Sequence, residues 1–379
     1  MDFSLTEDQI ALRDLARKIL EDHVTHERLK QVEAQPEWFD RATWDELAKA
    51  SLLGIALPED VGGSGLGLLE LAVLLTEVGR VVAAIPILPT LVLGALPLAE
   101  FGSAAQRSRH LPGVASGSTM LTAALIEVDN EDPVHPLTTA RRDGPGWRLD
   151  GIKTCVPVAH LAERILVPAR TGAEAVGVFL LDPRARGVEL TRQEATNHEP
   201  QFRLTLAGAT VADADVLGEP TRGAAIVDWT VQRALVGLCA LQAGITERVL
   251  HMTADYTKTR EQFGRPIGSF QAVAQRAADM YIDTEAIRLT MWQGAWRLVQ
   301  GLPAAEEIAA AKFWAAEAGQ RVVYAAQHLH GGIGVDTDYP LYRYFLWAKA
   351  IELSLGGATQ QLVRLGAAMA QAPARAQAA

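Results

Sequence analysis

The stretch TREQFGRPIGSFQ, from Thr259 to Gln271, combines side chains that bind anions and flat rings. Its Gly-Arg-Pro-Ile-Gly core would end one helix and start another, which leaves free backbone N–H groups at a helix start. Arg260 can donate two parallel hydrogen bonds to phosphate oxygens. Phe263 offers a flat apolar surface, and the Gln271 amide can donate and accept hydrogen bonds. These residues predict an anion site, although a solvated loop that caps a helix would explain them as well.

A second stretch, QHLHGGIGVDTDYP from Gln327 onward, is rich in glycine. Gly331 and Gly332 let a ligand come close to the backbone, as a diphosphate requires. His328 and His330 form a His-x-His pair, but no third histidine or cysteine stands near them in the sequence. Because a zinc site needs three or four protein ligands, we expect no metal here.

The pattern of apolar residues that must position these stretches changes twice along the chain. Apolar residues recur at helical spacing up to about Ala115, and again from Ala224 onward. Between them, short apolar runs alternate with turn clusters such as DGPG and DPRARG, which is typical of an antiparallel sheet or small barrel. We therefore predict an α+β multidomain fold. Its parts are an N-terminal helical domain over 1–116, a middle β domain over 117–220, a C-terminal helical bundle over 221–372 and a frayed tail over 373–379.

Composition excludes some classes of protein. The 379 residues carry a formal net charge of −10, which argues against a nucleic-acid surface because phosphate backbones need a concentrated basic patch. The two cysteines, Cys155 and Cys239, stand in apolar contexts and are expected to be buried. Two such residues cannot build a disulfide framework or a Cys-rich metal site, which favours a reducing, cytoplasmic location.

One uncharged run, from Val81 to Ala99, is almost long enough to span a membrane. It contains Pro86, Pro89 and Pro97, which break helices, so we interpret it as buried interior segments of a helical domain. The first residues show no basic segment followed by an apolar core, and no signal peptide is predicted.

Taken together, the two glycine-containing stretches resemble the motifs of the acyl-CoA dehydrogenase family. The pair T-R-E-Q-F-G-R-P-I-G-x-F-Q and H-G-G-x-G-x-x-x-x-Y-P carries the resemblance. LTEDQ near the start, LPEDVGGSG and GIKTCVPVAHLAERILVPAR extend it over nearly the whole chain. The resemblance implies the three-domain order predicted above and a tetramer that holds FAD between subunits.

The same resemblance implies roles for single residues. Arg260 and Gln271 match residues that reach across an interface to the diphosphate and adenosine of a neighbour's flavin. Gly331 and Gly332 match the turn that completes this contact with the neighbour's flavin. We call Arg260, Gln271, Gly331 and Gly332 the flavin clasp. The other predicted cofactor-binding residues lie in the same two motifs: Phe263, Phe270 and His328.

The sequence departs from the family at the catalytic base. Members use a glutamate to take the α-proton while hydride leaves for the flavin. At one of the two usual positions the alignment places Leu355 or Gly357, and at the other Gln232 or Ala234. None of these residues can accept the proton, so we predict no catalytic residue. The nearest acids, about one helical turn away, are Glu352 and Asp228.

The flavin-ring contacts of the family are also missing. Of its Thr-Glu-Pro stretch only Glu127 remains, in LIEVDNEDPVHPLTT. The family's Ile-Thr-Asn corresponds to Val156, Pro157 and Val158, which have no hydroxyl. The half of the site that holds the flavin ring is therefore lost, whereas the half offered to a neighbour's flavin is retained.

A heteromer explains this asymmetry. The chain resembles the base-less subunits of α2β2 heterotetramers of the family that desaturate a steroid side chain carried on CoA. A homologous partner would supply the glutamate, and an electron-transfer flavoprotein or similar acceptor would reoxidise the flavin. Two alternatives remain open: a homotetramer whose base is Glu352 or Asp228, and a flavin-free scaffold that binds acyl-CoA.

Overall fold

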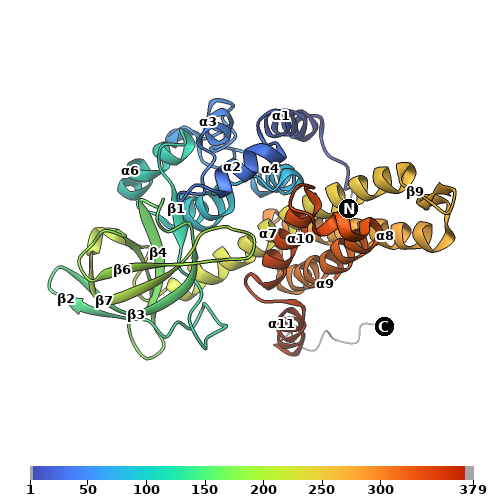
Figure 1. Cartoon of the computed structure of the whole chain (residues 1–379). Helices are drawn as coiled ribbons and strands as arrows, with labels where there is room; N and C mark the ends of the chain where they lie inside the picture. Colours follow the sequence, from blue (N-terminus) through green and yellow to red (C-terminus); the bar gives the residue numbers. More distant parts are fainter. Residues whose placement is uncertain (1–2, 372–379) are drawn as a thin grey trace. The chain divides into compact units, whose positions relative to one another are not determined.

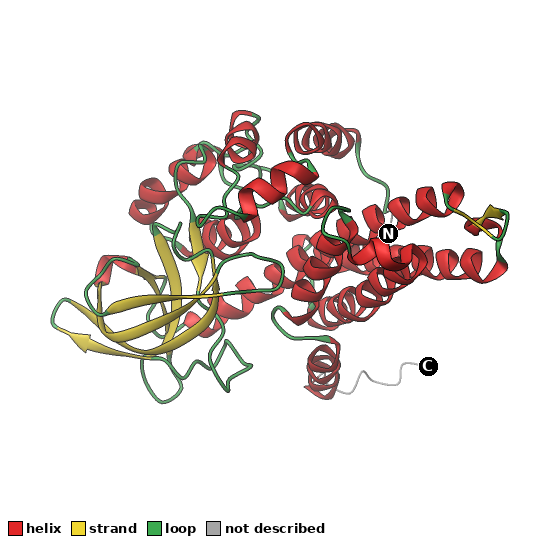
Figure 2. Ribbon diagram, in the orientation of Figure 1, coloured by secondary structure: helices red, strands yellow, loops and turns green. Residues whose placement is uncertain are grey.

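The computed structural model describes residues 3–371 and divides the chain into two compact units. The helical unit comprises Met1–Leu20, Ala72–Ala83 and Leu235–Ala379, and the sheet unit comprises Glu21–Leu71 and Ala84–Ala234. Figure 1 shows the elements along the chain, and Figure 2 shows strands in the sheet and in one small hairpin. The predicted domain boundaries near residues 116 and 220 stay predictions, and the tail over 373–379 lies outside the described residues.

The helices of the sheet unit begin where short polar side chains can cap them. Thr25 caps α2 (His26–Glu33), Asp40 caps α3 (Arg41–Lys49), and Ser103 forms a reciprocal capping box with Gln106 at the start of α6 (Ala104–Ala115). The unit also contains a 3-10 turn η1 (Glu59–Val61) and the helix α5 (Leu96–Phe101).

The apolar run from Val81 to Ala99 forms buried interior helices, as the sequence predicts. Helix α4 (Leu68–Val81) ends at Val81, the first residue of this run. A π-helix η2 (Leu88–Ala95) follows and continues directly into α5. Pro89 stands in the first turn of η2, where a missing N–H costs no hydrogen bond. Pro97 stands near the point where the helix changes from η2 to α5. The two helices together cover Leu88–Phe101, which is shorter than a membrane span requires.

The middle of the chain forms a mixed sheet. Its strand order is β6-β7-β3-β2-β4-β5-β8, with β1 beside β4. The strands are β1 (Leu121–Ala123), β2 (Thr139–Asp143), β3 (Gly146–Pro157), β4 (Arg164–Arg170), β5 (Val176–Leu181), β6 (Val188–Gln193), β7 (Gln201–Ala212) and β8 (Val216–Leu217). Most pairs are antiparallel, as predicted, but β1 and β2 both pair with β4 in parallel. Trp147 and Phe179 meet edge to face in the core, with ring centroids 5.4 Å apart.

The helical unit is a bundle of long helices. They are α1 (Glu7–His23), most of α7 (Gly223–Thr259), α8 (Gln271–Val299), α9 (Ala305–His330), α10 (Leu341–Leu353) and α11 (Ala358–Gln371). Helices α4 and α7 cross closely because glycines leave room. A Cβ atom at Gly79 would lie 2.1 Å from the Leu241 carbonyl oxygen, and one at Gly244 would lie 1.9 Å from that of Thr76.

Helix α7 is long and apolar enough to cross a membrane by length and composition. However, 67% of its most apolar window is buried inside the protein, as in the core helix of a globular domain. Charged residues link α1, α4 and α7. Glu77 is buried and binds Arg17 (Nη2–Oε1 2.8 Å) and Arg80 (Nε–Oε2 3.2 Å), and Arg80 also binds Glu247 (2.9 Å).

Candidate flavin-binding site

The first predicted stretch folds as a two-stranded hairpin between α7 and α8 (Figure 1). Its strands are β9 (Glu261–Gln262) and β10 (Arg265–Pro266), followed by the 3-10 turn η4 (Ile267–Ser269). The two turn residues, Phe263 and Gly264, both have positive φ (54° and 78°), the pattern of a type I′ turn. The Ile267 N–H donates to the Arg260 carbonyl oxygen at 2.8 Å and closes the base of the hairpin. The Gly-Arg-Pro-Ile-Gly core thus forms part of a hairpin whose residues are exposed or half-buried.

The aromatic residues of the hairpin differ in what they offer to a ligand. Phe263 is 92% exposed at the tip. Phe270 is half-buried: Phe263 meets it edge to face at 6.1 Å, and the Arg265 guanidinium lies 4.2 Å above its ring. The flat surface available for stacking is therefore that of Phe263.

Arg260 and Gln271 are both exposed. Within residues 3–371, neither side chain has a hydrogen-bond or ion-pair partner. Phe270 occupies the N-cap position of α8 without a side-chain cap, so the first turn of α8 keeps unsatisfied N–H groups. A guanidinium, an amide and a helix start are therefore all available to a ligand from outside this chain.

The second predicted stretch ends α9. Gly331 has φ 66° and ψ −142°, a conformation that glycine adopts with little strain. A Cβ atom at Gly331 or Gly332 would meet no atom of the protein within 4 Å. The first two residues of the 3-10 turn η5 (Gly331–Val335) therefore present open backbone to solvent, whereas Gly334 is buried.

The two histidines before this turn have separate roles. His330 is buried: its ring stacks on Tyr256 at 4.3 Å, Nδ1 lies 2.8 Å from the Ala326 carbonyl oxygen, and Nε2 lies 3.2 Å from the Tyr339 hydroxyl. Burial lowers the pKa of His330 and favours the neutral ring. His328 is exposed, and its Nδ1 accepts a hydrogen bond from Arg276 of α8. His330 fixes the glycine turn on α7, and His328 links it to α8.

The structure brings both stretches to the ends of α7, α8 and α9 but leaves them facing outward. Arg276, the partner of His328, stands five residues after Gln271 on α8, about one and a half turns along the helix. No hydrogen bond joins Arg260 or Gln271 to the glycine turn within the part of the chain that the structure describes. Among the same residues, no group of three His, Cys, Asp or Glu side chains forms a metal site, and no metal was predicted.

The loop at one expected base position, Leu355 to Gly357, is held by a buried lysine. The Lys312 ammonium donates to the carbonyl oxygens of Ile351 (3.0 Å), Glu352 (3.0 Å) and Gly356 (3.1 Å). Burial lowers the pKa of Lys312 to about 8. The sequence analysis missed this residue because its acceptors are backbone carbonyls about 40 positions later, which leave no signal in residue types.

Two further side chains hold the same loop. The Leu355 carbonyl oxygen accepts from Gln361 Nε2 at 3.1 Å and from Arg364 Nη1 at 3.0 Å. Leu355 has φ 54°, in the left-handed region that is unfavourable for a leucine. The surrounding hydrogen bonds therefore impose this backbone path.

Comparison with known proteins decides the family. The model of the acyl-CoA dehydrogenase N-terminal domain matches residues 6–118, and that of the C-terminal domain matches residues 221–370. The chain belongs to the acyl-CoA dehydrogenase family. Acyl-CoA dehydrogenase FadE27 of Mycobacterium tuberculosis is 42% identical over 99% of this chain and 100% of its own length.

Two solved structures, each named after two proteins, are similar to this chain. A chain of the ChsE4-ChsE5 complex from Mycobacterium tuberculosis is 41% identical with a TM-score of 0.93, over 99% of this chain and 100% of that one. A chain of the Tcur3481-Tcur3483 steroid acyl-CoA dehydrogenase is 47% identical with a TM-score of 0.90, over 96% and 98%.

Acyl-CoA dehydrogenases are FAD-binding flavoproteins, and one half of the flavin site fits that cofactor here. A Cβ atom added at Gly331 or Gly332 would point into open space. Among the described residues, the Arg260 guanidinium and the Gln271 amide have no hydrogen-bond partner. These groups suit a diphosphate and an adenosine. The assignment of Arg260, Phe263, Phe270, Gln271, His328, Gly331 and Gly332 to FAD binding stays a prediction from the family motif.

The other half, which would hold the flavin ring, offers fewer donors. The Val158 N–H donates to the Pro200 carbonyl oxygen at 2.9 Å, and the Thr122 hydroxyl donates to that of Pro157 at 2.9 Å. Pro157 itself has no N–H. The positions that match the family's Ile-Thr-Asn are therefore used within the protein.

Glu127, retained from the family's Thr-Glu-Pro stretch, is a buried structural carboxylate. It accepts hydrogen bonds from Lys153 (2.7 Å), the Thr138 N–H (2.8 Å) and the Thr138 hydroxyl (2.6 Å). Although burial opposes the charge, Lys153 and these donors lower the pKa of Glu127 to about 2. Burial lowers the pKa of Lys153 to about 8. Glu127 thus connects the loop that precedes β2, through Thr138, with strand β3, through Lys153.

The two acids considered as substitute bases are both engaged. Glu352 Oε2 lies 2.8 Å from the Lys349 ammonium. Asp228 Oδ2 accepts from Gln232 Nε2 at 2.7 Å, on an exposed part of α7. The expectation that both cysteines are buried is half wrong, since Cys239 is buried but Cys155 is exposed.

Proposed function

We propose that this chain is the base-less, FAD-sharing subunit of a heteromeric acyl-CoA dehydrogenase. In this proposal a homologous partner supplies the catalytic glutamate and the flavin-ring contacts. This chain supplies Arg260, Gln271 and the Gly331–Gly332 turn to the partner's flavin. The assembly would be an α2β2 heterotetramer.

The observation that carries the proposal is the state of the base positions. Leu355 and Gly357 have no acidic side chain, and the loop between α10 and α11 is fixed by Lys312, Gln361 and Arg364. Gln232 and Ala234, at the alternative position, also lack a carboxylate. The two acids nearby are bound by Lys349 and by Gln232. A base from another chain is the simplest source of proton transfer.

The predicted flavin contacts also support a site shared between two chains. The clasp residues face outward without internal partners, as a site completed by a second chain requires. When bound, FAD accepts the hydride that leaves the β-carbon of the acyl thioester. The part played by this chain is to hold the cofactor: Arg260 would neutralise diphosphate charge, Gln271 would bind the adenosine end, and the open glycine turn would admit the phosphates.

The similar proteins indicate a class of substrate. The two similar structures are a steroid acyl-CoA dehydrogenase and the ChsE4-ChsE5 complex, both heteromers by name. Together with the sequence resemblance to the beta subunit of 3-oxocholest-4-en-26-oyl-CoA dehydrogenase, they favour a CoA thioester with a steroid side chain, as in cholesterol catabolism. We also propose a cytoplasmic location and an electron-transfer flavoprotein or similar protein as the acceptor.

Co-expression tests the proposal. The chain purified alone should carry no stoichiometric flavin and should not reduce dye in the presence of acyl-CoA. The complex with a homologue that has the glutamate should do both, and Glu352→Gln in this chain should leave turnover unchanged. Turnover by this chain alone that Glu352→Gln abolishes would instead establish a self-sufficient enzyme.

A further inference from the structure

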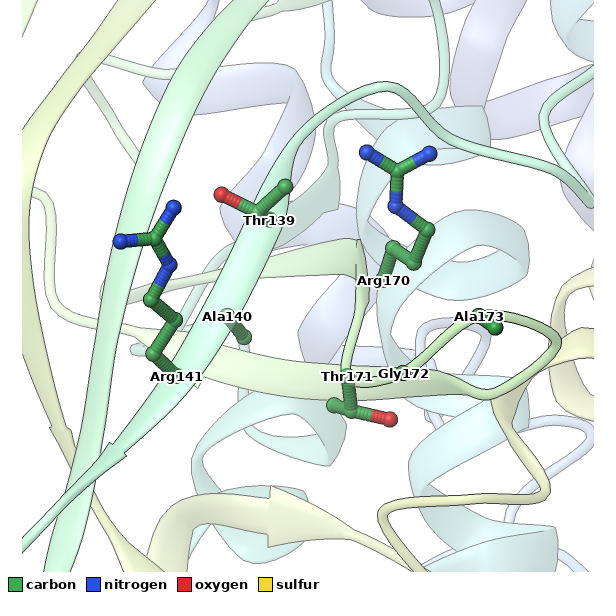
Figure 3. Close-up of a pocket in the computed structure, with 7 residues that line it drawn as sticks. All are labelled: Thr139, Ala140, Arg141, Arg170, Thr171, Gly172 and Ala173. Atoms are coloured by element: carbon green, nitrogen blue, oxygen red, sulfur yellow. The ribbon is translucent and has the colours of Figure 1, made fainter.

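The sheet unit contains a pocket of about 300 Å³ that none of the predicted flavin-binding residues lines. It lies where β2 and β4 run side by side, and the loop after β4 forms one wall. Two arginines from different strands, Arg141 and Arg170, line it together with Thr139, Thr171 and Gly172. Figure 3 shows both guanidinium groups pointing to the same side of the strands, with Thr139 between them.

The strand register explains why the two arginines share one face. Thr139 of β2 stands directly opposite Arg170 of β4, so their side chains project from the same side of the sheet. Arg141 follows Thr139 by two residues, and residues two apart on a strand share a face. The intervening Ala140 points to the other face and is buried. Backbone pairing therefore places both charges beside the pocket.

These two arginines differ from their neighbours in having no acidic partner. On the β2–β3 hairpin, Arg142 Nη1 lies 2.5 Å from Asp213 Oδ1. Arg148 Nε lies 2.5 Å from Asp143 Oδ2. Within residues 3–371, neither Arg141 nor Arg170 has an ion-pair or side-chain hydrogen-bond partner. In a chain with a formal net charge of −10, acidic partners are abundant. Both guanidinium groups are exposed and line the same pocket, so together they are available to an anion that is not part of the chain.

The wall of the pocket is ordered by the backbone. The Thr171 N–H donates to the Ala175 carbonyl oxygen at 2.8 Å, which closes the loop after β4. The Thr171 hydroxyl donates to the Pro220 carbonyl oxygen at 2.7 Å, which ties the loop to the segment before α7. The Thr139 hydroxyl donates to the Asp150 carbonyl oxygen at 3.4 Å. Because both hydroxyls have acceptors within the protein, the guanidinium groups are the side-chain donors without one. Their positions depend on a held loop and two paired strands.

We propose that this pocket binds a phosphomonoester group. A dianion offers enough charge and enough oxygen acceptors for two guanidinium groups, each of which can donate parallel hydrogen bonds. A pocket of about 300 Å³ is at the lower end of the sizes of small-molecule sites, so it accommodates phosphate with a sugar-sized remainder. The phosphate could be free or carried by a nucleotide, and the two sources are separated by experiment.

Calorimetric titration of the full chain at constant ionic strength tests this site. The probes are inorganic phosphate and adenosine 3′,5′-bisphosphate, and the variants are Arg141→Gln and Arg170→Gln. Arg203→Gln on β7 is the matched control, because it removes one exposed positive charge that does not line the pocket. We expect one saturable site in the wild type and in the control, weakened about tenfold or more by each pocket variant.

The outcomes are distinguishable. Equal affinity for both probes assigns the site to the phosphate alone, and tighter binding of the nucleotide assigns it to a phosphorylated nucleoside. No saturable binding of either probe, or an equal loss in Arg203→Gln, overturns the proposal. The flavin content of the co-expressed complex should stay unchanged in both pocket variants, since the proposed flavin clasp uses other residues.

Discussion

The ammonium of Lys312 lies 3.1 Å from the carbonyl oxygen of Gly356, in the loop at one of the two expected base positions. The same ammonium also donates hydrogen bonds to the last carbonyl oxygens of α10, so one buried charge replaces the solvent that would otherwise cap this helix. The Leu355–Gly357 loop therefore has a fixed shape without any carboxylate. It is a structural element of the bundle.

Replacing Lys312 tests that conclusion. Lys312→Met keeps the apolar stem but leaves the carbonyl oxygens of Ile351 and Glu352 without this donor, while that of Gly356 keeps Gln361 Nε2 at 3.0 Å. We expect a loss of about 2–4 kcal/mol in the free energy of unfolding. Lys349→Met, which removes the partly exposed partner of Glu352, should cost less than about 1 kcal/mol. Urea unfolding of the purified proteins measures both. Equal stability of the two variants would show that the Lys312 contacts contribute little.

The Glu127–Lys153 pair makes the free energy of unfolding depend on pH. The pKa of Glu127 falls from 4.5 to about 2 on folding, so its contribution is complete above pH 4.5 and is lost as pH falls toward 2. The shift corresponds to about 3 kcal/mol. Glu127→Gln should therefore destabilise the chain by about 3 kcal/mol at neutral pH, and the difference from wild type should shrink below pH 4.5.

Denaturant unfolding at several pH values between 3 and 7 measures this difference. Asp132→Asn is a suitable control, because Asp132 is an exposed acid in the same loop that pairs with exposed His135. A Glu127→Gln penalty that stays constant down to pH 3 would contradict the low pKa. It would indicate that shape, rather than charge, holds the loop.

Arg260 should control flavin retention but not chemistry. Arg260→Ala removes two charge-assisted hydrogen bonds to the diphosphate, worth about 1.5–3 kcal/mol each, so FAD affinity of the heteromer should fall at least tenfold. Arg260→Lys should restore only part of the loss, because a point charge does not reproduce the paired donors. Lys258→Ala, one helical turn from the hairpin, is the control.

Flavin content and turnover per bound flavin separate the two roles. Loss of flavin with nearly unchanged turnover per flavin is expected for Arg260→Ala. Full occupancy with a large drop in turnover per flavin would place Arg260 in the reaction, and the assignment of the hairpin to diphosphate binding would then be wrong.

Regular periodicity and motif spacing predicted most of the fold, because helices and strands leave repeating apolar patterns. Cys155 shows where this fails. A register shift between Lys153 and Val156 in β3, together with φ 51° at Cys155, turns the thiol outward although two apolar residues follow it. Lys153 is buried because Glu127, 26 residues earlier, neutralises it. A local pattern contains neither the bulge nor the distant partner.

The candidate site shows the same division. The exposed placement of Arg260 and Gln271 is consistent with a motif that serves another chain. The roles of His330 and Lys312 depend on tertiary contacts with Tyr256, Tyr339 and the end of α10. The family resemblance predicted that the usual base positions lack a carboxylate, and this stays a prediction. It did not predict the hydrogen bonds that hold the Leu355–Gly357 loop.

The glycine turn gives the most selective test of a shared flavin. Gly331 has positive φ, so Gly331→Ala strains the backbone both in the single chain and in the heteromer. It should lower the free energy of unfolding by about 1–3 kcal/mol. Gly332 does not have positive φ, and a Cβ atom there meets no protein atom within 4 Å. Gly332→Ala should therefore leave the melting temperature of the chain alone unchanged. In the heteromer the added methyl group would occupy space that the phosphates need, and flavin content should fall several-fold. Flavin content of the complex and thermal unfolding of the single chain measure the two effects. Normal flavin content in a well-folded Gly332→Ala heteromer would show that no cofactor approaches this turn.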